Sequence, residues 1–398
     1  MEFPFFTIAT QPRLVFGEWR IAELPDVIAE HGRKVLLVTG ARAFRASPHW
    51  PRLMEALDAA GIPHENLCVT DEPSPGLVDE AVQRFHGAGI EVVVGIGGGS
   101  VIDAAKAIAG LLPGGRSVLD YLEDVGRGLP YTGPATPFIA VPTTAGTGSE
   151  ATRNAVLSVR GRGGYKKSFR HEQLVARVAL VDPALLASCP PTHVAAQGMD
   201  AFTQLLESYL SVRANPFTDA LALSGLRAVN QGFMDAWRGG DTMAARNGRA
   251  AMAYAAYVSG VTLAQVGLGS VHGLAQPLGA FFPIPHGVAC GTVVAAATAM
   301  NIVALRERDP RGPGLRRYAD VGRLLSHEPT KDDTAACDAL VRVLDQWTVT
   351  LGLPRLSAYG VSEADLMRIV QAARNNSMKT NPVLLADEEI AAIVRARL

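Results

Sequence analysis

The sequence predicts two domains, an α/β domain over residues 1–187 and an all-helical domain over residues 188–398. The chain has 398 residues, which is more than one hydrophobic core ordinarily organises. In the first half, short apolar segments alternate with amphipathic ones, a pattern typical of a parallel sheet covered by helices. After Ser188–His193 the pattern becomes helical to the end of the chain. These changes place the domain boundary near Leu185–Pro191.

The elements expected in the first domain follow one another closely along the chain. Runs rich in Val, Ile and Leu predict buried strands at Lys34–Gly40, Ile90–Gly99, Phe138–Thr144 and Val178–Leu186. Amphipathic segments predict helices at Trp50–Gly61, Gly76–Gly89 and Val101–Leu112. In such an arrangement ligands bind at the carboxyl ends of the strands, so the loops that follow the strands are the first place to look for a site.

The composition argues against several classes of protein. Hydrophobic residues make up 48% of the chain and charged residues 19%, as in a globular enzyme and unlike a disordered chain. With a net charge of −1, the protein has no broad field to attract nucleic acid. The four cysteines show no CxxC pair and no disulfide-like spacing, so we expect reduced thiols. The N-terminal segment lacks the pattern of a signal peptide, so we expect a cytoplasmic protein.

Residues 250–305 contain no Asp, Glu, Lys or Arg. This stretch is a poor membrane span, because it carries His272, Gln276, His286 and several prolines, and its first part is rich in Ala, Gly and Ser. We expect a tightly packed helical interior instead, and no membrane partner.

A glycine-rich loop follows the second expected strand and opens a helix. Gly97, Gly98 and Gly99 leave backbone N–H groups uncovered, so that a pyrophosphate can approach the helix N-terminus. Ser100 and Asp103 have the spacing of a capping pair that would set the start of this helix. The dinucleotide pattern G-x-G-x-x-G is not met, because Ser100 stands where the third glycine would be. The alternative is a tight strand–helix turn without a ligand.

A second polar turn follows the next expected strand. Thr143, Thr144 and Thr147 offer hydroxyl and amide groups to a nucleotide or a sugar. The alternative is a turn whose hydroxyl groups satisfy its own backbone. Two such loops after two strands of one sheet should meet at the same edge, which favours a nucleotide site.

Polar residues in the second half suggest a metal site. Asp200, Gln204 and Glu207 recur at i, i+4 and i+7, so a helix would carry them on one face. His272 and His286 lie in the charge-free stretch, and two imidazoles with one carboxylate are a common set of ligands for a divalent metal. A solvated helix face and satisfied core histidines are the alternatives.

These motifs resemble those of the iron-containing (group III) alcohol dehydrogenases, relatives of glycerol dehydrogenase and dehydroquinate synthase. The matching stretches follow the family's order over nearly the whole chain; they are GIGGGSVIDAAKAIA, PTTAGTGSE, GYKKS, ALVDPALL, GMDAFTQLLESYLS, HGLAQPLGAFFPIPHG and NPVLLADEEI. The resemblance implies the dehydroquinate synthase-like fold, in which a Rossmann-like α/β domain is followed by an all-α metal-binding domain. It also implies an active site in the cleft between them, and NAD(P)-dependent interconversion of an alcohol with an aldehyde or ketone. We also expect a homodimer.

The resemblance implies roles for individual residues. Residues that match the family's cofactor loops are Gly97, Gly98, Gly99, Ser100, Asp103, Thr143, Thr144 and Thr147, and Lys167 matches a cofactor-contacting lysine. Asp200, His272 and His286 match ligands of a catalytic divalent metal, Fe²⁺ or Zn²⁺. Two positions depart from the family pattern. Gln204 stands where a further histidine ligand is usual, and Gln276 stands where a second histidine near the nicotinamide is usual. Glutamine is a weak, neutral ligand and cannot relay a proton near neutral pH.

The residues after the first expected strand bear on the choice of cofactor. NAD-preferring relatives often carry an aspartate there, whereas this chain has Gly40. The glycine removes a carboxylate that would repel a 2′-phosphate, and Arg42 or Arg45 could pair with one. The sequence therefore favours NADP(H), unless both arginines are simply solvated.

The expected mechanism is hydride transfer assisted by a metal Lewis acid, with Asp200, His272 and His286 as ligands and Gln276 beside the nicotinamide. The alternative within the same superfamily is a metal-free, maleylacetate-type reductase that holds an anionic substrate with cationic side chains. A dehydroquinate synthase-like lyase and a non-catalytic nucleotide-binding protein are further alternatives. The charge-free stretch argues against the reductase and the lyase, since both need a basic pocket.

Overall fold

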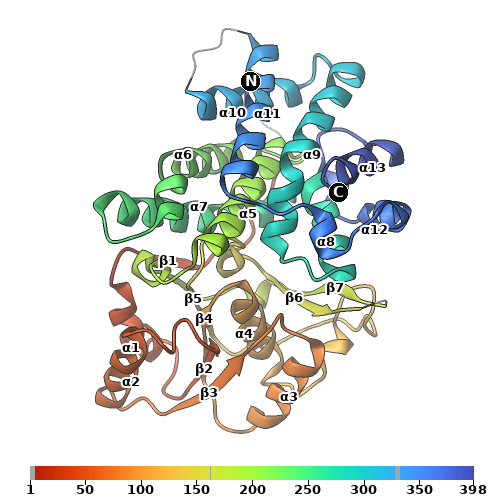
Figure 1. Ribbon diagram of the computed structural model, residues 1–398. Helices are drawn as coiled ribbons and strands as arrows, with labels where there is room; N and C mark the ends of the chain where they lie inside the picture. Colours follow the sequence, from red (N-terminus) through yellow and green to blue (C-terminus); the bar gives the residue numbers. More distant parts are fainter. Residues whose placement is uncertain (1–4, 162, 328–331) are drawn as a thin grey trace.

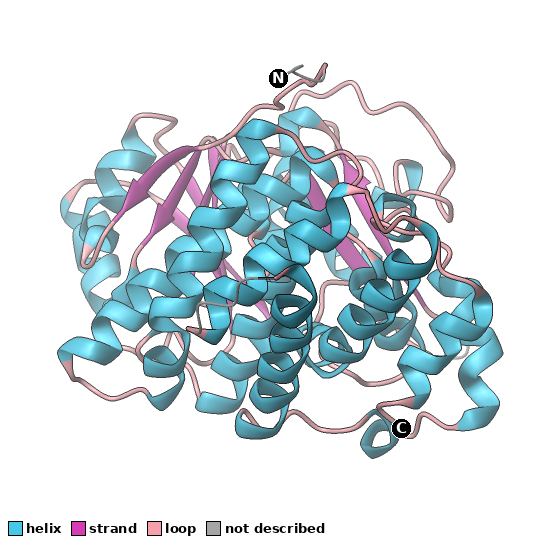
Figure 2. Cartoon of the chain, turned by 90° about the horizontal axis from the view of Figure 1, so that it is seen from above, coloured by secondary structure: helices cyan, strands magenta, loops and turns pink. Residues whose placement is uncertain are grey.

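The computed structural model describes residues 5–161, 163–327 and 332–398. Its first half forms a sheet with helices on both faces, and its second half forms a layer of helices above that sheet (Figure 1). Figure 2, seen from above, shows this helical layer lying over the strands. The fold is therefore an α/β Rossmann-like region followed by an all-α region, which confirms the predicted fold class.

Within the described residues, six parallel strands form the main sheet in the order β1-β8-β5-β4-β2-β3. Their bounds are β1 Arg13–Phe16, β2 Val35–Gly40, β3 His64–Val69, β4 Val92–Gly97, β5 Phe138–Pro142 and β8 Val178–Val181. Strands β2, β4, β5 and β8 confirm the four predicted strands. The edge strands β1 and β3 were not predicted, because their sequences RLVF and HENLCV lack a long apolar run.

An antiparallel hairpin, β6 (Asn154–Val159) and β7 (Tyr165–Arg170), stands apart from the main sheet. It was not predicted either, since YKKSFR is too polar to indicate a buried strand. The hairpin joins the two halves, because β7 packs against helix α8 (Ser270–Phe281) of the helical region.

Alternate residues of the central strands face two separate apolar layers. Val35 and Leu37 pack with α1 (Leu24–Ala29) and α2 (His49–Ala59). Leu36 and Val38 face the other side, where α3 (Pro75–Phe85) and α4 (Gly99–Leu111) pack. This is the pattern of a sheet buried on both faces, and α2, α3 and α4 confirm the three predicted helices.

From Pro191 onward, the secondary structure of the described residues consists of α-helices and 3₁₀ turns joined by loops. The helices besides α8 are α5 Pro191–Leu210, α6 Pro216–Arg238, α7 Met243–Val266, α9 His286–Arg308, α10 Pro313–Ser326, α11 Asp333–Thr350, α12 Leu366–Ala373 and α13 Asp387–Arg395. Helix α5 lies at the centre of this region and packs against α6, α7 and α9. Nearly every residue of α5 from Ala195 on is buried, so its polar side chains must find partners inside the protein.

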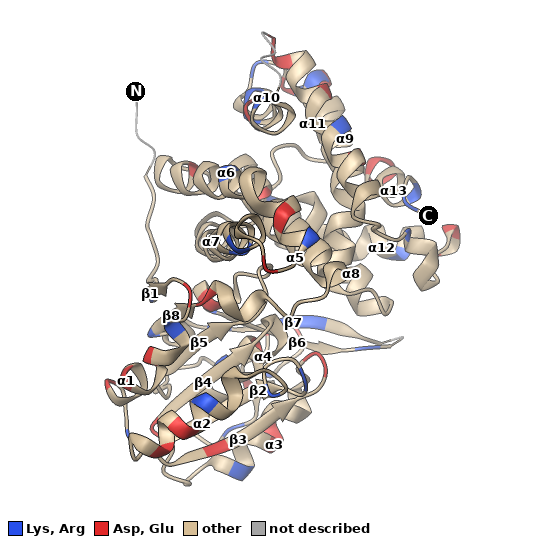
Figure 3. Ribbon diagram, turned by 60° about the vertical axis from the view of Figure 1, so that its left-hand side comes forward, with Lys and Arg blue, Asp and Glu red and all other residues tan. Residues whose placement is uncertain are grey.

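The charge-free stretch forms most of α7, all of α8 and most of α9. By length and composition α9 could cross a membrane, and α7 with α8, bent by 101°, passes the same test as a pair. In the fold, 72% of the apolar window of α9 is buried against other parts of the protein, as in the core helix that the sequence predicts. Figure 3 shows charged residues scattered over the outer helices of both halves rather than gathered on one face.

Candidate active site

The two polar loops meet at the carboxyl edge of the sheet. Gly97 of β4 pairs with Pro142 of β5, and the N–H of Thr143 donates to the carbonyl of Gly97 over 2.9 Å. A Cβ atom at Gly98 would lie 3.3 Å from Oγ1 of Thr144. One at Gly99 would lie 2.7 Å from Cγ2 of Thr147. The glycines thus let the backbone at the N-terminus of α4 approach the threonines of the second loop, with no side chain of its own between them.

The predicted capping pair does not form. Helix α4 begins at Gly99 with Gly98 as its N-cap, and no side chain caps it among the described residues. Ser100 lies one residue inside the helix. The carboxylate of Asp103 accepts instead from the hydroxyl of Ser149. The capping prediction was wrong because a long-range partner for Asp103 replaces the local one.

The buried lysine Lys106 ties α4 to the second loop. Its ammonium group donates to the carbonyl of Ser149 at 2.8 Å, to Oγ1 of Thr152 at 3.0 Å and to the carbonyl of Asn154 at 2.6 Å. It also lies 3.6 Å from Oδ1 of Asp103. Asp103 and Lys106 therefore fix the loop that carries Thr143, Thr144 and Thr147. Lys106 was not predicted to have a role, because a lysine in a helix is usually solvated and its sequence position gives no sign of its buried partners.

The residues around Gly40 lie at the end of β2. Arg45 donates from Nε to Oγ1 of Thr39 over 2.6 Å, and its guanidinium lies 4.7 Å from the centre of the Trp50 ring. A Cβ atom at Gly40 would meet only Cγ2 of Val101, at an ordinary contact distance of 3.7 Å. Arg45 is thus held in place, whereas Arg42 is exposed.

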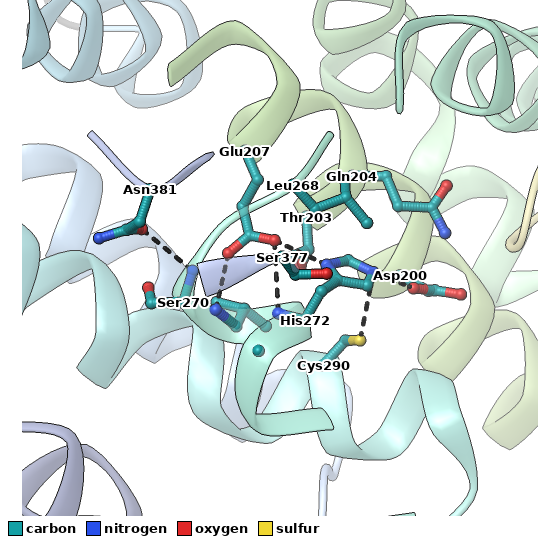
Figure 4. A network of polar contacts seen from close by, with 12 residues as sticks. Asp200, Thr203, Gln204, Glu207, Leu268, Ser270, His272, Cys290, Ser377 and Asn381 are labelled. Atoms are coloured by element: carbon teal, nitrogen blue, oxygen red, sulfur yellow. Dashed lines mark hydrogen bonds and ion pairs between the residues drawn. The ribbon is translucent and has the colours of Figure 1, made fainter. Parts of the chain in front are cut away.

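Asp200, His272 and His286 come together in the helical region, as the sequence indicates, and Cys290 joins them. One donor atom from each of the four residues lies within 4.8 Å of the others. Oδ1 of Asp200 is 3.3 Å from Nε2 of His272 and 3.7 Å from Nε2 of His286. Sγ of Cys290 is 3.7 Å and 3.8 Å from the same two nitrogens. Figure 4 shows the thiol and the Asp200 carboxylate directed toward His272.

Glu207 orients His272 from the opposite side. Its Oε2 lies 2.7 Å from Nδ1 of His272, and its Oε1 accepts the N–H of Val271 at 2.6 Å (Figure 4). A histidine N–H held by a carboxylate presents its other nitrogen to a metal, and this arrangement is usual among metal-binding histidines. A solvated helix face is the alternative that the sequence leaves for the polar row that includes Glu207. The structure excludes it for Glu207, which is buried and holds His272.

The cluster is electrostatically coupled. Burial by itself would raise the pKa of Asp200, but the imidazoles of His286 and His272 hold it below its usual range. Burial lowers the pKa of His286 to about 4 and raises the pKa of the Cys290 thiol to about 12. The imidazole of His286 is therefore neutral at pH 7, as metal binding requires. A cation bound at the cluster would lower the pKa of the Cys290 thiol instead, because a thiol that binds a metal loses its proton.

The residues present fit a divalent metal. A carboxylate, two imidazoles and a thiol converge on one point, with all but His286 buried, and these are the donors that such ions take from proteins. Nδ1 of His286 is buried without a partner among the described residues, so it is available to water or to a bound molecule. His286 is the most accessible member, with 29% of its side chain exposed.

The side-chain amides of the two glutamines form hydrogen bonds with other parts of the protein. The Ser259 hydroxyl donates to Oε1 of Gln204 over 2.6 Å, and Nε2 of Gln276 donates to the carbonyl of Lys166 over 2.9 Å. On β7, Lys167 pairs with Asp124 at 2.7 Å. Lys166 pairs with Glu72 at 3.3 Å, and its charge reaches His286. Of the two lysines, Lys166 is the one whose charge contributes to the lowered pKa of His286.

Cys290 was missed as part of the site. The spacing of the four cysteines predicts only reduced thiols, and a cysteine in an apolar helix is usually a core residue. Its spacing carried a signal, because a residue four positions after His286 lies on the same face of a helix.

Family models match both halves of the chain. The model described as iron-containing alcohol dehydrogenase covers residues 11–183, and the one described as Fe-containing alcohol dehydrogenase family, C-terminal, covers residues 194–398. The chain belongs to the iron-containing alcohol dehydrogenase family. It is therefore an oxidoreductase that acts on alcohols. Membership of this family implies a metal and a nicotinamide cofactor.

Curated relatives and solved structures agree along the full length. Alcohol dehydrogenase 4 of Saccharomyces cerevisiae is 32% identical over 394 residues, covering 96% of each chain. The NAD-dependent methanol dehydrogenase of Bacillus methanolicus is 30% identical over 397 residues, covering 97% of this chain and 98% of its own. A crystal structure of 1,3-propanediol oxidoreductase superposes with a TM-score of 0.89 at 28% identity, covering 99% of this chain and all of that one.

Proposed function

We propose that this iron-containing alcohol dehydrogenase family member interconverts a small alcohol and its aldehyde, with NADP(H) as preferred cofactor and one divalent metal. The observation that carries the proposal is the convergence of Asp200, His272 and His286 on one point. The metal-free alternative would hold an anionic substrate with cationic side chains, and residues 250–305, which supply both histidines, contain no Lys or Arg.

Asp200, His272 and His286 would hold the metal, and a divalent cation there supplies a Lewis acid for the substrate oxygen. Glu207 holds Nδ1 of His272, which turns Nε2 of the same ring toward Asp200 and Cys290. The buried surroundings exclude water from three of the four donors, and the partly exposed His286 marks the side from which substrate can arrive.

The N-terminus of α4 supports the cofactor proposal. The bare backbone at Gly98 and Gly99 is suited to the pyrophosphate, with the threonines of the second loop beside it. The preference for NADP(H) is supported by Gly40, which brings no carboxylate, and by Arg45, whose guanidinium is positioned by Thr39 and Trp50. An arginine at this position can pair with a 2′-phosphate.

Gln276 sets a limit on proton transfer. Its amide has no titrating group and already donates to the carbonyl of Lys166. The alcohol proton therefore leaves through water or the cofactor ribose, on the exposed side of His286.

The proposal includes a cytoplasmic homodimer. The four cysteines are free thiols, as expected in a reducing compartment. Strand β1 has only β8 as a neighbour among the described strands, and Leu14 and Phe16 are each 37% exposed beside it. An open edge with apolar side chains is a natural contact for a second copy of the chain.

The test of the proposed function is a screen at the absorbance band of the reduced nicotinamide. Purified protein is loaded with Fe²⁺ or Zn²⁺ and assayed on a series of alcohols and aldehydes with NAD and NADP. We expect cofactor-linked turnover that disappears after chelation, and we expect His272→Ala to lose both metal and turnover. A His272→Ala protein that remains fully active after chelation would refute the metal requirement.

A further inference from the structure

The metal cluster contains a sulfur donor beside the three expected ligands. Cys290 is fully buried on α9, one helical turn after His286. Its Sγ contacts Nε2 of both histidines, and Asp200 also lies against the thiol. We propose that Cys290 is a protein ligand of the metal, in place of Gln204, and that the resulting set favours zinc over ferrous iron. This inference rests on the metal-binding role proposed above.

Four of the six separations between the donor atoms are known, and they are close to those of a tetrahedral centre. With bonds of about 2.0–2.1 Å to nitrogen or oxygen and about 2.3 Å to sulfur, donors at tetrahedral angles lie about 3.3–3.6 Å apart. The separations are 3.3 Å and 3.7 Å from Asp200 to the two imidazoles, and 3.7 Å and 3.8 Å from Cys290 to them. Donors at right angles, as in an octahedral iron site, would lie about 3 Å apart. The thiol thus lies at nearly the same distances from the two imidazoles as the Asp200 carboxylate does.

Gln204 is not available for the position that a histidine usually takes. The Ser259 hydroxyl on α7 holds its amide oxygen at 2.6 Å, and the amide points away from the thiol (Figure 4). The neutral amide would in any case be a weaker donor than a thiolate. Compared with the family pattern, the chain lacks the histidine at position 204 on α5 and has Cys290 on α9. The number of strong protein donors therefore remains four.

The identity of the added donor bears on the choice of metal. A thiolate with two imidazoles and one carboxylate is a typical set for zinc, whereas ferrous iron in enzymes is more often held by imidazoles and carboxylates. Zinc held by these four residues would still supply a Lewis acid for the substrate oxygen. The partial exposure of His286 leaves one side of the cluster accessible for that purpose.

X-ray absorption at the zinc edge tests the ligand directly. The full chain is purified, loaded with zinc, and compared with Cys290→Ser and with Cys337→Ser, a second buried cysteine outside the cluster. We expect one sulfur neighbour at about 2.3 Å in the wild type and in Cys337→Ser, and only nitrogen and oxygen neighbours in Cys290→Ser. We also expect Cys290→Ser to bind zinc at least about tenfold more weakly, measured against a chromophoric chelator.

Loading from an equimolar anaerobic mixture of Zn²⁺ and Fe²⁺ tests the preference. The wild type should take up mainly zinc, and the zinc-to-iron ratio should fall about tenfold in Cys290→Ser. A ratio that Cys290→Ser leaves unchanged would overturn the preference.

The remaining outcomes separate this inference from the proposed function. Bound metal without a sulfur neighbour in the wild type would overturn the role of Cys290 and leave the dehydrogenase proposal standing, whereas a wild type that binds no metal would overturn both. If Cys290→Ser fails to fold, as judged by circular dichroism, cobalt-loaded wild type decides instead. It should show the intense near-ultraviolet band of a thiolate bound to Co²⁺, and a spectrum without that band would overturn the proposal.

Discussion

Glu207 and His272 form a buried pair in which Oε2 of the carboxylate lies 2.7 Å from Nδ1 of the imidazole. The same carboxylate accepts the N–H of Val271, so the start of α8 and the orientation of the ring are set together. Helix α5 therefore acts on the metal cluster twice, directly through Asp200 and indirectly through Glu207.

Glu207→Gln should weaken metal binding while leaving the ligands in place. The amide can accept one N–H, but it lacks the charge that fixes the tautomer of His272 and strengthens it as a ligand. We expect a 10- to 100-fold loss of metal affinity, on the order of the effect of other such partners. Glu363→Gln, which changes an exposed carboxylate, is the control and should bind metal like the wild type. Equal affinities in the two variants would contradict the role of Glu207.

Gly99→Ala should block the cofactor loop. The added methyl group would lie 2.7 Å from Cγ2 and 2.8 Å from Oγ1 of Thr147, closer than real contacts allow, so the Thr147 side chain or one of the two loops must shift. We expect the KM for the nicotinamide cofactor to rise at least about tenfold, since a displacement of about 1 Å has large effects on bound geometry. The matched control is Gly76→Ala in the first turn of α3, where the new methyl group meets only Oγ of Ser74, at 3.9 Å.

Gln276→His should introduce a titrating group beside the cluster. An imidazole can keep the hydrogen bond to the carbonyl of Lys166, which the glutamine now makes over 2.9 Å. With an ordinary pKa of about 6.5, it would add a new limb near neutral pH to the profile of kcat/KM. Gln265→His on α7, whose oxygen accepts the N–H of Ala9, serves as control. If both variants keep the wild-type profile, proton transfer does not pass by this position.

Gly40→Asp should shift the cofactor preference toward NAD. The carboxylate fits, because the Cβ atom would meet only Val101 at 3.7 Å. It would accept from the ribose 2′-hydroxyl and repel a 2′-phosphate. A charged hydrogen bond of this kind is worth roughly 1.5–3 kcal/mol, so the ratio of kcat/KM for NAD over NADP should rise at least about tenfold. Arg45→Ala should lower kcat/KM for NADP alone, and Arg52→Ala on the exposed face of α2 should change neither. A wild type that prefers NAD would refute the NADP proposal outright.

Much of the fold follows from patterns that the sequence carries locally. Strands β2, β4, β5 and β8 are apolar because both faces of the sheet are covered, so their composition alone indicates them. The hairpin β6–β7 is different, since its polar strands are stabilised by contacts with α4 and α8 from distant parts of the chain. Such tertiary contacts leave no local pattern in the sequence.

The site divides in the same way. The role of Asp200, His272 and His286 as metal ligands can be predicted, because each lies in a sequence motif that resembles the family's. The direction of Gln204 depends on Ser259, 55 residues away, and the place of Cys290 in the cluster depends on how α9 packs against α5 and α8. For Asp103 a local prediction was wrong. Its spacing from Ser100 predicts a helix cap, but its carboxylate instead accepts from Ser149, 46 residues along the chain.

Glu150→Gln should change how stability depends on pH. Glu150 lies in the 3₁₀ turn Ser149–Ala151 and is only 3% exposed. Burial raises the pKa of its carboxyl group from 4.5 to about 7, with Lys106 opposing the rise and Asp103 adding to it; Tyr257 of α7 also faces the group. The folded state therefore holds this proton more tightly than the unfolded state does.

The sign of the effect follows from this raised pKa. The stabilisation from the bound proton is fully present below about pH 4.5 and is lost as the pH rises to about 7. The loss is on the order of 3 kcal/mol, which corresponds to roughly 3–4 °C in Tm for a chain of this size. Glu150→Gln, which stays neutral, should show a flatter curve of Tm against pH across this window and a higher Tm than wild type at pH 8. The exposed variant Glu388→Gln should follow the wild-type curve, and a Glu150→Gln curve parallel to it would show that Glu150 is charged in the fold.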